Sequence, residues 1–271
     1  MKNLRPLSEN LCVGPEQQGN HILVVDRRNR TSENCVRTHG NACSPSLVLV
    51  QVGFMTDFAS AREAMVERQL KRRGISEPEI LEAFRAVPRE AFISDEYAHL
   101  AYGDHPLPIE ANQTISQPYI VALTIQAAEI KPGDKVLEVG AGSGYAAAVI
   151  SRIAGRVIGI ERQHDLVEVA RERLSRLGYD NVEIVEGDGT KGCPAHAPFD
   201  AIVAAASGSH VPHSFIEQLR DGGRIVMPLG GAGWVQELIK MTKRPDGTVD
   251  RENLGGVRFV PLIGAEGWKD A

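Results

Sequence analysis

Three glycines at alternate positions, Gly140, Gly142 and Gly144, directly follow a short apolar run that contains one acidic residue, Glu138. Glycine allows a tight backbone turn and lets a ligand approach the backbone without an intervening side chain. An alanine-rich, helix-favouring stretch then begins at Tyr145. A strand, a glycine turn and a helix form the first unit of a nucleotide-binding α/β sheet, although a plain turn between strand and helix remains the alternative for these glycines alone.

Acidic residues end the next two predicted strands. Glu161 lies 21 residues after Gly140, close to the roughly 20 residues expected for a carboxylate that holds ribose hydroxyls. Asp188, between Gly187 and Gly189, follows the third strand, so it is expected to face the crevice at the carboxyl ends of the strands. There it would accept a hydrogen bond from an adenine amino group, unless it is only a turn residue. The pairing of Glu161 with the glycine turn predicts an adenosine-containing ligand.

The glycine spacing separates two kinds of adenosine ligand. Dinucleotide sites favour G-x-G-x-x-G, in which a helix N-terminus meets a pyrophosphate, whereas this chain has G-x-G-x-G. The carboxylate of Glu138 would repel a pyrophosphate and would suit a cation such as a sulfonium with its ammonium group, unless it is a solvent-exposed charge at the strand end. An NAD-dependent oxidoreductase is disfavoured by this spacing and by the lack of a plausible hydride-transfer site.

The elements that must position these residues follow an α/β rhythm. Two helices are expected after Asp57, the first ended by Gly74 and the second opened by a capping box at Ser76. Helices are also expected at 118–129, 145–153, 165–177 and 212–219, and strands at 136–139, 156–160, 182–185, 199–204, 223–228, 235–242 and 258–261. This alternation predicts an α/β fold with a doubly wound, mostly parallel sheet, an N-terminal helical cap and an antiparallel far edge.

Composition indicates which partners and which location in the cell are expected. The net charge of −5 is unlike that of a general nucleic-acid or anionic-membrane binder, and no apolar run approaches the roughly 18 residues of a membrane span. The chain start lacks the apolar core of a secretory signal, and the four cysteines form no disulfide framework. Cys35, His39 and Cys43 could ligate one metal, but no C-x-x-C pair supports a metal site. A cytoplasmic monomer with reduced thiols and no metal is expected.

Several sequence motifs resemble those of a known class of enzymes, and five further stretches resemble one family within it. The motif E-V-G-A-G-S-G at 138–144, together with Glu161 and G-D-G at 187–189, resembles the class I S-adenosylmethionine-dependent methyltransferases. Within that class, the chain resembles the protein-L-isoaspartate (D-aspartate) O-methyltransferase family over about residues 57–264. The stretches that carry the family resemblance are V-P-R-E-A-F at 87–92, Q-T-I-S-Q-P at 113–118, P-F-D-A-I at 198–202, Q-L-R-D-G-G-R at 218–224 and R-F-V-P-L at 258–262.

The resemblance implies a Rossmann-like methyltransferase domain over residues 55–271 and S-adenosylmethionine as methyl donor, without a metal. Residues 1–54 are punctuated by Asn, Arg, Ser and Gly and precede the helical pattern that opens at Met55, so they are expected to be an extension that is poorly ordered or an upstream-start artefact. The implied reaction is methyl transfer to the free α-carboxylate of L-isoaspartyl residues in damaged proteins and peptides, which initiates repair through a succinimide. The residues expected to bind the donor are Glu138, Gly140, Gly142, Ser143, Gly144, Glu161, Asp188 and Gly189.

The serine of T-I-S-Q-P is the family's active-site residue, so the resemblance gives that role to Ser116. Its neighbours Gln113, Thr114, Ile115, Gln117 and Pro118 form, with it, what we call the substrate loop. A carboxylate is already an anionic nucleophile, so the protein must supply alignment and exclusion of water, where proximity alone contributes roughly 7–11 kcal/mol. Ser116 could instead, or in addition, cap a helix that begins near Pro118.

Two departures from the family pattern bear on loop conformation and substrate contacts. Residues 109–112 read I-E-A-N where the family usually has a glycine, and the fourth strand ends in Ala204-Ala205-Ala206 where a threonine is common. Two other readings stay open at this point. One is a different methyltransferase, acting on a small carboxylate or another protein group, and the other is a non-catalytic protein that uses the fold as a binding scaffold.

Overall fold

A computed structural model of the chain describes residues 57–231 and 235–269. The expected extension at 1–54 and the candidate metal ligands Cys35, His39 and Cys43 lie outside the described residues. Within the described residues no helix is long and apolar enough to cross a membrane.

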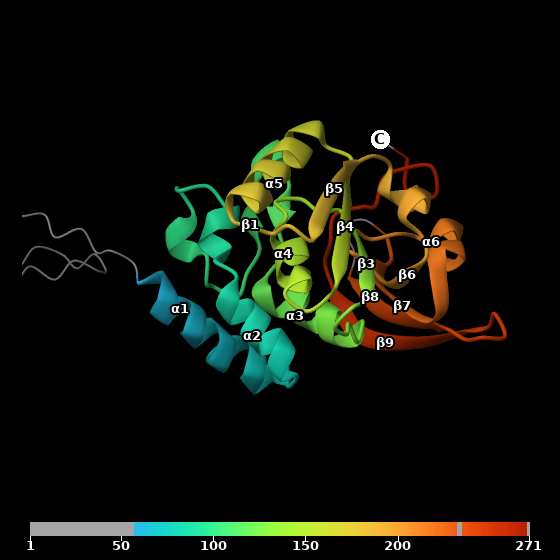
Figure 1. The fold of residues 1–271 in the computed structure, drawn as a ribbon, viewed down its shortest axis with the longest axis horizontal. Coiled ribbons are helices and arrows are strands. Elements are labelled where there is room, and N and C mark those ends of the chain that lie inside the picture. Colours follow the sequence, from blue (N-terminus) through green and yellow to red (C-terminus); the bar gives the residue numbers. More distant parts are fainter. Residues whose placement is uncertain (1–56, 232–234, 270–271) are drawn as a thin grey trace, which may run out of the picture. The chain divides into compact units, whose positions relative to one another are not determined.

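A seven-stranded sheet is the centre of the fold, with the strand order β5-β4-β3-β6-β7-β8-β9 (Figure 1). The five strands from β3 to β7 are parallel, whereas β8 and β9 pair antiparallel at one edge. This arrangement confirms the predicted doubly wound sheet with an antiparallel far edge. The strands are β3 (Lys135–Val139), β4 (Arg156–Glu161), β5 (Val182–Glu186), β6 (Phe199–Ala204), β7 (Leu219–Leu229), β8 (Gln236–Lys243) and β9 (Val249–Val257).

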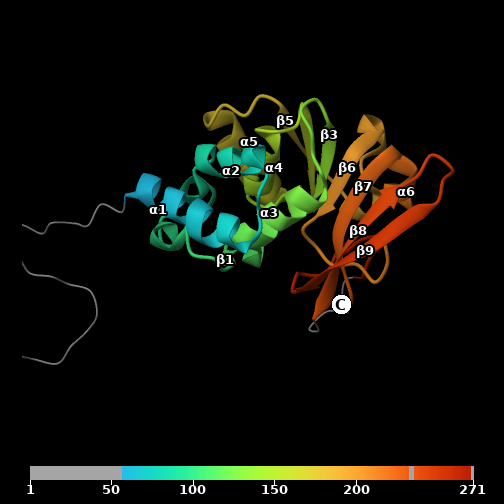
Figure 2. The same ribbon diagram turned by 90° about the horizontal axis from the view of Figure 1, so that it is seen from below.

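Side chains of the strands alternate between two apolar layers, as a pleated sheet requires. On β3, Val136 packs on one face of the sheet, and Leu137 and Val139 pack on the opposite face. Both views place α3, α4 and α5 on the face of Val136 and α6 on the face of Leu137 and Val139 (Figures 1 and 2). These helices are α3 (Pro118–Ala127), α4 (Tyr145–Ser151), α5 (His164–Arg176) and α6 (His213–Gln218).

The N-terminal helices pack beside α3 and α4 (Figure 2). The first, α1 (Phe58–Met65), continues through a π-helical turn at Val66–Leu70 and a 3₁₀ turn at Lys71–Arg73, and ends at Gly74 in the left-handed region as predicted. The second, α2 (Pro78–Ala86), starts without the predicted capping box. The backbone N–H of Ser76 donates instead to the Gln126 amide oxygen of α3 (3.0 Å), so a tertiary contact replaced the local cap.

The far edge also differs from the prediction. The last strand is β9, and the predicted strand at 258–261 makes only an isolated bridge, from Pro261 to Ser207. β9 was not predicted because most of its side chains are exposed, so it lacks the alternation of apolar and polar residues that indicates a half-buried strand. Residues 258–263 cross the carboxyl edge of the sheet instead. A two-stranded ribbon joins β1 (Leu107–Pro108) to β2 (Thr114–Ile115), which lies within the substrate loop.

Candidate active site

The glycine turn stands where the sheet changes direction. From β3 the strand order runs outward to β4 on one side and to β6 on the other, and this point of reversal is where open α/β sheets bind ligands. Gly140, Gly142 and Gly144 have φ angles of 84°, 53° and 85°, a region that favours glycine. The turn is tied to β4 because the N–H of Gly140 donates to the Ile160 carbonyl (2.9 Å).

Two cavities meet at this turn. One, of about 70 Å³, is lined by Ser116, Glu138 and Ser143, and by apolar side chains of α3 and α4. The other, of about 210 Å³, is lined by Glu161 and the start of α5, and by residues 260–263. Four residues line both cavities, which therefore adjoin along the carboxyl edge of the sheet: Thr114, Gly140, Gly142 and Ala205.

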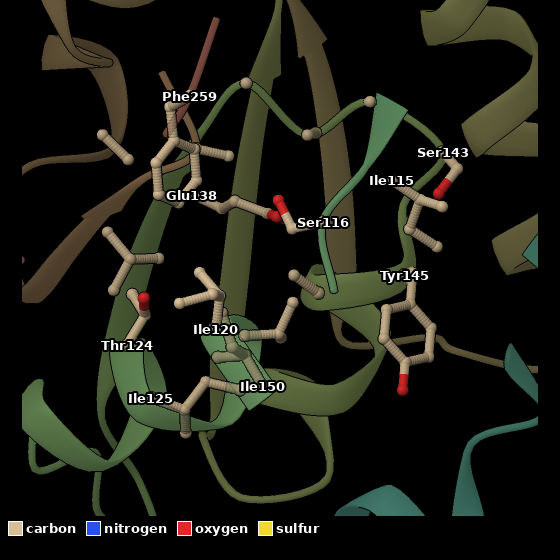
Figure 3. A pocket seen from close by; sticks show the side chains of 18 of the residues that line it. Ile115, Ser116, Ile120, Thr124, Ile125, Glu138, Ser143, Tyr145, Ile150 and Phe259 are labelled. Atoms are coloured by element: carbon tan, nitrogen blue, oxygen red, sulfur yellow. The ribbon is translucent and has the colours of Figure 1, made fainter. Parts of the chain in front are cut away.

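Glu138 is a buried carboxyl group with one unpartnered oxygen. Its side chain comes from β3, the residue is 3% exposed, and the Oε2 atom has no hydrogen-bond partner. Burial, and then the nearby charge of Glu161, raise the pKa of Glu138 to about 8. Figure 3 shows this carboxyl group and the Ser116 hydroxyl beside each other in the view, and both line the smaller cavity. A cation in that cavity would favour the ionised carboxylate.

Glu161 lies at the end of β4 and is also buried, at 7% exposure. Its Oε2 accepts a hydrogen bond from the Gly142 N–H (3.0 Å), and its Oε1 accepts from the N–H groups of Arg162 (2.8 Å) and Gln163 (3.0 Å). The carboxylate thus links the glycine turn to the start of α5. Carboxylate oxygens have further lone pairs, so Glu161 can still accept from ribose hydroxyls in the larger cavity.

The substrate loop brings Ser116 to the smaller cavity. α3 begins at Pro118, its N-cap position is Gln117, and no side chain caps it, so the alternative reading of Ser116 as the helix cap is wrong. Gln113 lines the larger cavity, and Thr114 lines both cavities. Ile115 is buried in the wall of the smaller cavity. The Gln117 side chain instead donates to Asp104 (3.1 Å), and Pro118 is buried at the start of α3 without lining either cavity.

Asp188 is held by its own turn and by the C-terminal segment. Its Oδ1 accepts from the Thr190 N–H (3.0 Å) and hydroxyl (2.6 Å), and its Oδ2 accepts from the Ala265 N–H (2.9 Å). Partial burial alone would raise the pKa of Asp188, but these hydrogen bonds outweigh it and the pKa lies below its ordinary value. Asp188 lines a hollow next to the larger cavity, with Arg162 and Ile263, whereas Gly189 lines the cavity itself. Its contact with adenine stays a prediction.

Sequence reasoning did not assign three parts of the two cavity walls. The first part is the segment after β9, in which Phe259 lines the smaller cavity and residues 260–263 line the larger one. The R-F-V-P-L stretch at 258–262 was the sequence signal that could have assigned this segment to the site. Tyr145, at the start of α4, and an apolar floor from α3 also line the smaller cavity, with Ile120, Thr124 and Ile125 on that floor (Figure 3). Within residues 57–231 and 235–269, no group of three or more His, Cys, Asp or Glu side chains could hold a metal.

A doubly wound sheet with a carboxylate-flanked glycine turn at its switch point defines a class I S-adenosylmethionine-dependent methyltransferase. The orphaned Glu138 oxygen fits the cationic donor of this class. The model of the protein-L-isoaspartate(D-aspartate) O-methyltransferase family matches residues 60–267, and the chain belongs to this family.

Individual relatives support this membership of the family. Protein-L-isoaspartate O-methyltransferase 2 of Pelobacter propionicus is 54% identical over 207 residues, which are 76% of this chain and 92% of the relative. The enzyme of Rhodopseudomonas palustris is 53% identical over 76% of this chain and 94% of the relative. A solved protein-L-isoaspartate O-methyltransferase is 32% identical with a TM-score of 0.71, covering 76% of this chain and 67% of that one. A putative Plasmodium falciparum enzyme, in complex with S-adenosyl-L-homocysteine, is 28% identical with a TM-score of 0.65, covering 74% and 98%.

Proposed function

We propose that Ser116 acts at the methyl-transfer site, where it holds the α-carboxylate of an L-isoaspartyl residue against the methyl donor. The observation that carries this proposal is the shared cavity, because Ser116, Glu138 and the glycine turn line the same one. The chain is a protein-L-isoaspartate O-methyltransferase that uses S-adenosylmethionine, and its methylation of isoaspartyl residues in damaged proteins and peptides initiates their repair through a succinimide.

S-adenosylmethionine supplies, when bound, an activated methyl group on a sulfonium. Glu138 would face the positive end of this group, Glu161 would accept from the ribose hydroxyls, and Asp188 would accept from the adenine amino group. The backbone of Gly140, Gly142, Ser143, Gly144 and Gly189 forms the close-fitting surface between them. The support for these roles is the placement of the two buried carboxylates on adjoining cavities and the left-handed glycines that keep side chains out of the turn.

Ser116 donates a hydrogen bond that orients the attacking carboxylate, and the rest of the substrate loop shapes the approach. No base is required, because the carboxylate is ionised at neutral pH. The apolar side chains of α3 and Phe259 keep water from the reacting atoms, which strengthens every electrostatic contact in the cavity.

We also propose that the enzyme works as a monomer in the cytoplasm, on proteins and peptides rather than on nucleic acids or membranes, and that residues 1–54 are dispensable for activity. The net charge of −5 supports proteins and peptides rather than nucleic acids or anionic membranes as partners. A truncated chain that starts at residue 55 is expected to keep the activity and the melting temperature of the full chain. Collapse of both in the truncated chain would contradict the proposal.

The activity is tested with methyl-labelled S-adenosylmethionine and two peptides that differ only in having aspartate or isoaspartate at one position. Base-labile label on the isoaspartyl peptide alone is the expected result. Equal labelling of both peptides would indicate a different carboxyl methyltransferase, and no labelling of either would indicate a binding scaffold.

A further inference from the structure

The segment that leads into the substrate loop has an unfavourable backbone. Ala111 and Asn112 both have φ of 54°, and among the described residues only Glu129 is another non-glycine residue with positive φ. A Cβ atom makes this left-handed region unfavourable, more for alanine than for asparagine. These two residues stand where the family usually has a glycine. Something else must therefore hold this segment in place.

An ion pair with α5 holds it. The Arg173 guanidinium donates from Nη2 to Glu110 Oε1 (2.7 Å) and from Nη1 to Glu110 Oε2 (3.3 Å), which makes a two-pronged contact. The Arg173 side chain is 11% exposed and that of Glu110 is 34% exposed. Burial alone would raise the pKa of Glu110, but the bonds to Arg173 outweigh it and the pKa lies below its ordinary value. Solvent therefore screens this pair less than a surface pair.

The ion pair connects two parts of the cofactor site. On the loop side, Ile109 lies against Gly142 of the glycine turn, and the N–H of Gln113 donates to the Glu110 carbonyl (3.2 Å). On the helix side, Leu174 of α5 lies against Gly144 of the same turn. Because Gln113, Thr114 and Ser116 line the two cavities, the loop cannot move outward without opening the walls of both.

We propose that the ion pair between Glu110 and Arg173 is a latch that keeps the substrate loop closed over the cofactor, so that its opening controls release of S-adenosylhomocysteine. Both residues are positioning residues, since neither lines either of the two cavities of the site. The latch offsets the unfavourable left-handed backbone of Ala111 and Asn112. The proposal rests on the proposed function for the identity of the cofactor.

The test is the rate at which labelled S-adenosylhomocysteine leaves the full-length enzyme when it is chased with excess unlabelled compound. Glu110→Gln keeps the size of the side chain and removes its charge, and should accelerate release about tenfold, the cost of one charge-assisted hydrogen bond. Glu168→Gln is the matched control, because Glu168 pairs with Arg171 on the exposed surface of α5 (2.9 Å). It should change the rate by less than about twofold.

A second variant and a second readout guard against a general loss of folding. Arg173→Lys keeps the charge but loses the two-pronged geometry, and should give an intermediate acceleration. The KM for an isoaspartyl peptide should rise in Glu110→Gln. Without ligand the variant should still unfold in one cooperative transition, at a melting temperature somewhat below that of the control, because a less screened ion pair is lost. Unchanged release in Glu110→Gln, or equal acceleration in Glu168→Gln, would overturn the latch. If the wild type methylates no isoaspartyl peptide while release still depends on Glu110, the proposed function fails and the latch stands.

Discussion

The buried Glu138 gives a prediction that can be worked through in numbers. Its ordinary pKa is 4.5 and its pKa in the folded protein is raised to about 8. The folded state therefore keeps this proton over a range in which the unfolded chain has lost it, and folding stability falls as the pH rises between these two values. From pH 5.5 to pH 8 the loss amounts to roughly 3 kcal/mol.

Glu138→Gln removes this dependence, because the amide does not titrate. The melting temperature of the variant minus that of the wild type should be higher at pH 8 than at pH 5.5 by roughly 6–12 °C, for a domain of this size. Any fixed cost of the buried amide cancels in this comparison. Differential scanning calorimetry of both proteins at the two pH values measures the quantity.

The same two proteins can be compared with S-adenosylmethionine bound. A cation beside Glu138 favours the ionised carboxylate, so S-adenosylmethionine should stabilise the wild type more at pH 8 than at pH 5.5. In Glu138→Gln the pH dependence of this stabilisation should be smaller. A melting-temperature difference that is the same at both pH values would refute the reasoning, since it would mean that Glu138 is already ionised in the folded protein.

Three other substitutions have distinct expected outcomes. Ser116→Ala should lower turnover of an isoaspartyl peptide by at least about tenfold while changing the Kd for S-adenosylmethionine little; normal turnover would show that its assigned role is wrong. Glu161→Gln should weaken binding of S-adenosylmethionine by about tenfold or more in calorimetric titration, because it affects both the ribose contact and the bond to Gly142. Ala111→Gly should raise the melting temperature by a few degrees, because glycine tolerates φ of 54°, and a fall would argue against strain there.

The sheet and the glycine turn could be predicted because their signals are local. Apolar runs mark the buried parallel strands, and Glu138 and Glu161 follow from their distances along the chain. The capping box at Ser76 was wrong because a contact with Gln126, fifty positions away, replaced the local bond. β9 was missed because its exposed side chains lack a periodic pattern. The bond of Asp188 to Thr190 is the local contact of a turn residue, which the glycines beside it indicated. Its bond to Ala265 could not be foreseen, because spacing does not reveal what the C-terminal segment contacts.

The polar character of β9 has a consequence for an enzyme that handles damaged polypeptides. Within the described sheet, β9 pairs with β8 on one side only, so its other edge carries backbone groups that an extended foreign chain could join. Charged side chains at Asp250, Arg251 and Glu252, and the glycines Gly255 and Gly256, make that edge a poor template. An extended segment of another polypeptide is thereby discouraged from adding a strand at β9, so this edge does not extend the sheet into a second chain.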